Sequence, residues 1–208
     1  MPTPQEILRQ LAEITNEQRL VAMGWHVMMA IVAIVAIALG LGWRPSRRQA
    51  ALGLAGPCVS VAILAAVHGN PFNAAVFTAL AAFLALAGLR LEAGRVVRGA
   101  AWTAWVGGAT LTFGLVYPHF LEVSGWLEHL LAAPFGVIPC PTLAVTIGLL
   151  LVADGLGSRI VALVRAVAGV LCALFGALRL GVSIDLVLLV GSFALLARAL
   201  LPARGSLS

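Results

Sequence analysis

The sequence predicts an all-α, polytopic bundle of transmembrane helices, and two observations lead to this prediction. Sixty-two per cent of the 208 residues are hydrophobic and only 10 per cent are charged, whereas about a quarter of an ordinary soluble domain is charged. The apolar residues also fall into runs close to the roughly twenty residues that a helix needs to cross a hydrocarbon layer of about 30 Å. We expect about seven spans, with six as the alternative, in a single integral membrane domain covering residues 1–208.

The segment before the apolar runs has a different pattern. Ile7, Leu8, Leu11 and Ile14 recur at helical spacing among charged residues, which predicts an amphipathic helix on the membrane surface within residues 1–20. A solvated helix that leads into the first span is the alternative. We do not expect a cleavable signal peptide, because no basic region precedes an apolar one in this segment.

The fifth predicted span is the weakest of the seven, and a long connection precedes it. Only twelve residues separate Pro141 from Asp154, and each residue of a helix adds about 1.5 Å. The preceding segment, residues 118–140, is too apolar for a free loop. We therefore expect a short interfacial helix and then a re-entrant stretch, so that span five begins below the outer surface. The predicted spans cover residues 22–43, 50–67, 71–89, 99–117, 141–157, 160–178 and 183–201.

The basic residues, all thirteen of which are arginine, give an orientation. Ten of them follow odd-numbered spans and only Arg9, Arg19 and Arg179 fall on the opposite side. The excess of arginine predicts a multi-pass protein of the bacterial inner membrane with its N-terminus outside and its C-terminus in the cytoplasm. The arginines punctuate apolar runs and form no patch, which excludes a nucleic-acid partner. Three cysteines are too few for a disulfide scaffold.

Polar residues collect on the predicted outer side, where all four histidines fall. No histidine pair has the spacing of a known zinc or haem motif. Each histidine therefore has an alternative role as a helix cap or an interfacial residue bonded to water. We predict an outward-facing pocket there, either for a small solute, lined by Cys140, His129, His68 and Asp185, or for a transition-metal ion held by Cys140, His129, His68 and His26.

The stretch AAPFGVIPCPTLAV places Cys140 between Pro139 and Pro141. Each proline keeps the preceding residue extended and fits the first turn of a helix. We therefore expect Cys140 just outside a helix start, where the helix dipole favours its thiolate. The alternative is structural: the prolines, with Gly136, end the re-entrant stretch and Cys140 packs as a small apolar residue.

A charge close to the start of the last span needs a partner. Asp185 lies in SIDLVLLVG, and Arg179, six residues earlier on the same side, is the expected partner. A cation or proton site at Asp185 is the alternative. Small residues also recur four apart, which predicts close helix packing within the bundle or against a partner. They are Ala100, Ala104 and Gly108 in span four and Gly169, Ala173 and Ala177 in span six.

The run FGVIPCPTLAVTIGLLL, with the earlier Tyr-Pro pair and the later LGVSIDLVLLVG, resembles a family of bacterial multi-pass membrane proteins known only as a domain of unknown function and marked by an FG-x-x-PCPT box. The resemblance implies a helix bundle of this span count and no known activity. The positions it marks in this chain are Tyr117, Pro118, His129, Pro134, Phe135, Gly136, Pro139, Cys140, Pro141, Thr142, Gly148 and Asp185.

The leading hypothesis is a membrane protein that binds a metal ion or small solute from outside, for uptake, sensing or delivery. The alternative is an accessory subunit with no ligand site, which packs through its small-residue faces as a homo-oligomer or within a larger membrane complex. An enzyme is the least favoured class. The chain has no strained nucleophile turn, phosphate-binding glycine loop or dinucleotide fingerprint, and one activated thiol is weak support for catalysis.

Overall fold

The computed structural model describes residues 3–38, 44–91 and 94–201, and over these residues the chain is all-α, as the sequence predicts. Short irregular helical turns connect some of the helices: η1 (Asp154–Gly157), η2 (Phe175–Arg179) and η3 (Ser183–Asp185). The α-helices of the described part are α1 (Pro4–Glu17), α2 (Arg19–Ala38), α3 (Arg47–Val67), α4 (Pro71–Arg90), α5 (Ala101–Leu115), α6 (Trp126–Ala132), α7 (Pro139–Val152), α8 (Arg159–Leu174) and α9 (Leu186–Leu200).

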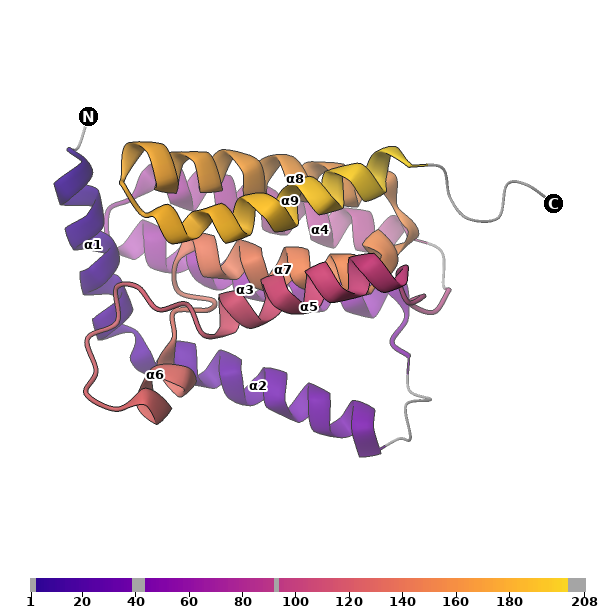
Figure 1. Cartoon of the computed structure of the whole chain (residues 1–208), viewed down its shortest axis with the longest axis horizontal. Coiled ribbons are helices and arrows are strands. Elements are labelled where there is room, and N and C mark those ends of the chain that lie inside the picture. Colours follow the sequence, from indigo (N-terminus) through magenta and orange to yellow (C-terminus); the bar gives the residue numbers. More distant parts are fainter. Residues whose placement is uncertain (1–2, 39–43, 92–93, 202–208) are drawn as a thin grey trace.

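Most of the helices lie along one common axis. α2, α3, α4, α5, α7, α8 and α9 run along the long axis of the molecule, whereas α1 crosses one end of it (Figure 1). We call this the α1 end; it also holds α6 and the connections 116–125 and 180–185. The opposite, arginine end holds residues 44–46, 94–100 and 153–158. The helix α1 begins with a capping box, in which the Thr3 N–H donates to the Glu6 carboxylate and thereby lowers the pKa of Glu6.

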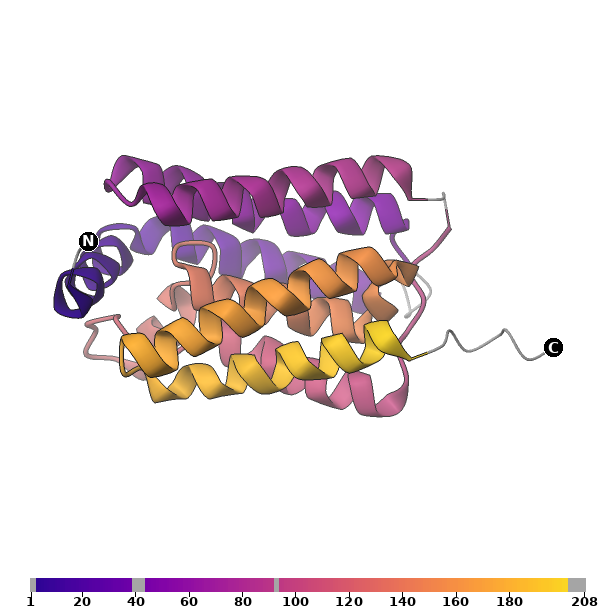
Figure 2. The ribbon, with the colours of Figure 1, turned by 90° about the horizontal axis from the view of Figure 1, so that it is seen from above.

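The core of the bundle is centred on α7. All residues from Pro141 to Gly148 are buried, and α7 contacts α3, α5, α8 and α9. The hairpin α3–α4 lies along one side of the molecule and the pair α8–α9 along the other (Figure 2). A helix buried on every side is apolar all round, which explains why the sequence of α7 shows no polar face.

Four helical stretches among the described residues are long and apolar enough to cross a membrane: Arg47–Val67, Pro71–Arg90, Arg159–Arg179 and Ser183–Leu200. The chain is therefore a helical protein with the candidate spans of a multi-pass membrane protein. Seven spans were predicted from the sequence, and one of them corresponds to α7. This helix has only 14 residues and covers about 21 Å of the roughly 30 Å needed. The prediction also includes the first span, of which residues 39–43 lie outside the described part.

Glycines, which have no side chain, allow α5 and α7 to approach closely. A Cβ on Gly107 would lie 2.7 Å from the Gly148 carbonyl oxygen, and one on Gly114 would lie 2.7 Å from the Pro141 carbonyl oxygen. Sequence spacing predicted a face containing Gly108, but Gly108 has nothing within 4 Å. Within the bundle the contact is therefore made by Gly107, the neighbouring residue, and packing of the Gly108 face against a partner stays a prediction. Adjacent residues on a helix point about 100° apart, so spacing alone does not say which of two glycine rows faces α7.

The segment before α7 enters the bundle. Residues 132–138 are all buried and pass from α6 into the start of α7. Gly136 has a left-handed φ of 76°, and a Cβ there would overlap the Trp25 ring. The Gly136 N–H donates to Thr142 Oγ1 at 2.9 Å, so the irregular backbone is satisfied by a side chain. A buried non-helical stretch with its polar groups paired is what a re-entrant segment requires.

Candidate functional site

A cavity of about 470 Å³ opens near the α1 end, between α4 and α8. Its volume is within the range of small-molecule sites in proteins. Several residues that line it, including Phe72, Leu171 and Phe175, are also exposed on the apolar outer surface of the bundle. The mouth of the cavity therefore opens on the exposed apolar surface of the bundle. Further lining residues are Ile7, Leu11, Val76, Phe120, Val164 and Val167.

The polar groups of the cavity lie around one carboxyl group. Asp185 is 1% exposed, and its Oδ1 accepts a hydrogen bond of 2.7 Å from the Tyr117 hydroxyl. The Cys140 thiol lies beside the same carboxyl group, and Cys172 also lines the cavity. Asn73 of α4 completes the polar part of the wall. The site is thus an apolar chamber with a single ionisable carboxyl group at one end.

The carboxyl group fits there because of the irregular backbone around it. The π-helical turn η2 precedes the left-handed Gly181, and the Val182 N–H donates to the Gly176 carbonyl at 2.9 Å, which folds the chain back on itself. A Cβ on Gly176 would collide with Asp185 Oδ2. A π-helical turn inside a helix is often associated with a functional site, and here it makes room for a buried acid.

The expected pair between Arg179 and Asp185 does not form. Arg179 is exposed, and the described residues give Asp185 a hydroxyl partner, Tyr117, in place of a guanidinium. Arg179 is the last residue of η2. Asp154, the acid before α8, accepts two hydrogen bonds from Arg198, at 2.6 and 2.9 Å.

The proline-flanked cysteine lies inside a helix. α7 begins at Pro139, with Ile138 as its N-cap, so Cys140 and Pro141 both belong to the first turn. We had expected Cys140 just outside the helix start. Both prolines fit the first turn because the N–H groups there have no partner within the helix. As a result, Cys140 is held rigidly between Ile138 and the cavity.

None of the three histidines predicted as ligands lines this cavity. His26 joins helices through its ring nitrogens, which lie 2.9 Å from the Ala22 carbonyl and 2.8 Å from the Leu115 carbonyl. His68 lies 3.2 Å from Glu17 at the start of the α3–α4 turn, and His129 belongs to α6. Of the predicted ligands, only Cys140 and Asp185 come together. Within residues 3–38, 44–91 and 94–201, no group of three or more His, Cys, Asp or Glu side chains could hold a metal ion.

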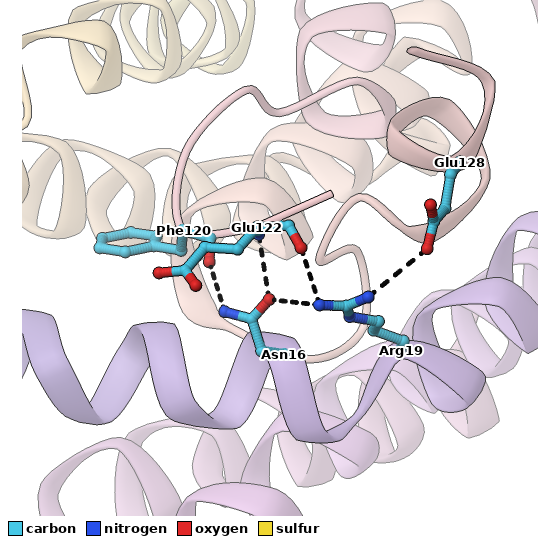
Figure 3. Close-up of polar contacts among 5 residues, drawn as sticks. All are labelled: Asn16, Arg19, Phe120, Glu122 and Glu128. Atoms are coloured by element: carbon cyan, nitrogen blue, oxygen red, sulfur yellow. Dashed lines mark hydrogen bonds and ion pairs between the residues drawn. The ribbon is translucent and has the colours of Figure 1, made fainter. Parts of the chain in front are cut away.

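A polar clamp at the α1 end covers the cavity, and the sequence did not indicate it. Asn16 Nδ2 donates to the Phe120 carbonyl at 2.9 Å, and the Glu122 N–H donates to Asn16 Oδ1 at 3.0 Å (Figure 3). Arg19 donates to the Glu122 carbonyl at 2.8 Å and reaches Glu128 at 3.4 Å. Phe120, held at a left-handed φ of 73°, lines the cavity. We call Asn16, Arg19, Phe120, Glu122 and Glu128 the α1 clamp.

The chain matches no protein-family model, no curated protein and no solved structure. The resemblance to the membrane proteins with the FG-x-x-PCPT box therefore stays a prediction from the residues.

Proposed function

We propose that this protein is a multi-pass membrane protein that binds a small amphiphile, with an apolar body and a cationic head, in the cavity headed by Asp185. The apolar body would lie along α4 and α8, and the head would meet the carboxyl group beside Cys140. This proposal keeps the small-solute form of the prediction from sequence. It leaves out the metal ion, because the predicted ligands are dispersed.

The observation that supports a cationic head is that Asp185 forms no ion pair among those of the described residues. Its carboxyl group is buried, and no arginine among the described residues forms an ion pair with it. A lone carboxylate in an apolar setting is costly, so it takes up a proton unless a cation comes close. A cationic ligand removes that cost, whereas an anionic one adds to it. The Tyr117 hydroxyl can donate to the carboxylate that such a ligand would meet.

The apolar lining of the cavity supports an apolar body for the ligand. Phe72, Leu171 and Phe175 are 73%, 62% and 48% exposed although they line the cavity. A ligand dissolved in the bilayer can therefore enter sideways without crossing water. Burial of its apolar body contributes roughly 25 cal/mol per Å², and the head group then decides which amphiphile is preferred.

The test compares amphiphiles that share a chain and differ in the head. Decylammonium, decanol and decanoate are added to the protein in lipid nanodiscs, and the shift of the unfolding midpoint measures binding. We expect decylammonium to bind at least about tenfold more tightly than decanoate, a difference of about 1.4 kcal/mol. The preference should vanish in Asp185→Asn and persist in Glu13→Gln, whose exposed carboxylate pairs only with Arg9 and lies outside the cavity. Equal shifts for the three compounds in wild type would contradict the proposal.

A second candidate function, packing against another membrane helix, is favoured by a different observation. A groove of about 460 Å³ runs between α3 and α4, lined almost entirely by small side chains such as Ala62, Ala66, Ala74 and Ala81. Small residues let helix backbones approach in a bilayer. If a second copy of the chain fills this groove, a cysteine at Ile63, which is 56% exposed beside it, would form a disulfide between copies under mild oxidation. A cysteine at Leu163 on α8, 41% exposed, is the control.

A further inference from the structure

Two connections and two helix ends lie together at the arginine end. Ser46 and Arg95 form an isolated antiparallel bridge, which joins the connection before α3 to the connection after α4. The first turn of α3 packs against the last turn of α4, since a Cβ on Gly88 would lie 3.6 Å from the Arg48 carbonyl oxygen and 2.9 Å from the Ala51 Cβ. The basic residues of this region, which we call the arginine cluster, are Arg47, Arg48, Arg90 and Arg95.

The arginine cluster carries more positive than negative charge. All eight acidic residues of the chain except Glu92 and Asp154 lie at the α1 end. Asp154 binds Arg198, and Glu92 lies outside the described residues. Even with Glu92 counted against them, the arginines of the cluster outnumber the acids. Arg47 and Arg48 also lie in the first turn of α3, which contains no acid and where the helix dipole adds positive potential. The cluster therefore favours an anion as its partner.

Exposed leucines lie next to the cluster on the same two helices. Leu52 follows Arg48 by four residues on α3, and Leu86 precedes Arg90 by four residues on α4, so the members of each pair share one helix face. Leu52 is 41% exposed and Leu86 is 57% exposed, and both helices are candidate membrane spans. An anion dissolved in water would contact the arginines alone. A phospholipid would contact the arginines with its phosphate and the leucines with its acyl chains.

We propose that the arginine cluster binds the phosphate headgroup of an anionic phospholipid, whose acyl chains lie along Leu52 and Leu86. A guanidinium makes two-point contacts with phosphate oxygens, and arginines beside a membrane span attract anionic headgroups. A zwitterionic headgroup carries a cation of its own, which the cluster repels. The lipid site is independent of the ligand proposed for the Asp185 cavity.

The first test compares compounds that separate the headgroup from the acyl chains. Phosphatidylglycerol, phosphatidylcholine with the same acyl chains, and soluble glycerol phosphate are added at equal concentration to the protein in mild detergent, and the unfolding midpoint is measured. We expect phosphatidylglycerol to raise the midpoint clearly more than the other two compounds. An equal rise with phosphatidylcholine would mean that headgroup charge is not recognised, and an equal rise with glycerol phosphate would mean a site for free phosphate. Either result would overturn the proposal.

A matched pair of double variants locates the binding. Arg48→Gln/Arg90→Gln removes two charges from the cluster, and the control Arg9→Gln/Arg179→Gln removes two from the α1 end. All four side chains are exposed, so both variants should fold. Native mass spectrometry during a lipid titration gives the Kd for phosphatidylglycerol. We expect about tenfold weaker binding in the cluster variant, recovery in Arg48→Lys/Arg90→Lys, and wild-type binding in the control. If the cluster variant binds as tightly as the control, the proposal fails.

Discussion

The carboxyl group of Asp185 packs directly against Gly176. A methyl group on the glycine would collide with a carboxyl oxygen of the acid. We predict that Gly176→Ala forces the carboxyl group away from the Tyr117 hydroxyl and lowers stability by roughly 1–3 kcal/mol, the usual cost of overpacking. The preference for decylammonium should fall with it. Denaturant unfolding and the amphiphile series measure the two effects. Gly53→Ala, in a helix with nothing within 4 Å, is the control and should not lose stability.

Gly136 is constrained twice, by a left-handed φ and by the Trp25 ring that covers it. We predict that Gly136→Ala destabilises the protein by about 2 kcal/mol or more, because the strain at positive φ adds to the steric conflict. The unfolding midpoint against that of Gly24→Ala, where the structure leaves open space, measures the effect. Equal midpoints for the two variants would contradict the buried course of residues 132–138.

At the level of single residues, the sequence indicated the acid and the proline-flanked cysteine but not their neighbours. Asp185 is conspicuous because an acid beside an apolar helix is expensive. Its true partner, Tyr117, is 68 residues away, and which distant residue meets it depends on helix rotation and register. Arg165 and Cys58 were missed for the same reason. Neither residue stands out until the fold brings Arg165 Nη2 to 3.2 Å from the Cys58 sulfur.

The turn between α7 and α8 is fastened to the end of α9. Asp154 has a left-handed φ of 51° and accepts from both Nε and Nη2 of Arg198. The pair is largely shielded, with side-chain exposures of 25% and 18%, and a two-point guanidinium–carboxylate contact is stronger than a simple ion pair. We predict that Arg198→Met costs about 1–2 kcal/mol of stability. A double-mutant cycle with Asp154→Asn measures the coupling, and strictly additive losses would show that the contact contributes nothing.

The α1 clamp makes α1 and the connection after α5 a cover for the cavity. We predict that Asn16→Ala, which removes its bonds to Phe120 and Glu122, raises the labelling rate of Cys140 by a water-soluble maleimide about tenfold, as expected when local opening becomes easier by about 1.4 kcal/mol. The experiment uses a chain in which Cys172 is serine and the fully buried Cys58 is kept. Glu13→Ala, which breaks only an exposed pair with Arg9, is the control. Identical rates in the two variants would mean that α1 does not cover Cys140.

Elements were predicted better than their contacts. Hydropathy located the runs that became α3, α4, α8 and α9, and the shortness of the fifth run anticipated a 14-residue α7. A short helix was predicted within residues 118–140, and α6 (Trp126–Ala132) lies in that segment. The packing face of α5 was not predictable from spacing, because Gly107 and Gly108 are adjacent and only the fold shows which one meets α7. The hydropathy pattern of the sequence predicts where the helices lie. Contacts between helices depend in addition on how each helix is rotated about its axis.

The two ends of the whole molecule differ in charge. The arginine end receives eight of the described arginines, Arg44, Arg47, Arg48, Arg90, Arg95, Arg98, Arg159 and Arg198, whereas Arg9, Arg19 and Arg179 lie at the α1 end. An excess of arginine marks the cytoplasmic side of a membrane protein. In the sequence, these arginines follow every second predicted span. The arrangement of the helices brings them together at one end of the molecule.

We predict from this asymmetry that the α1 end faces outward in a bacterial inner membrane. In a chain without its own cysteines, Ser124→Cys lies in the exposed connection of the α1 end, and Val97→Cys, 50% exposed, lies at the arginine end. A membrane-impermeant maleimide added to spheroplasts should label the first and reach the second only after lysis. The reverse pattern would place the α1 clamp and the entrance beside it in the cytoplasm, so that a ligand held at Asp185 would come from the inner leaflet. The amphiphile preference itself would stand in either case, because the cavity mouth opens on the exposed apolar surface of the bundle.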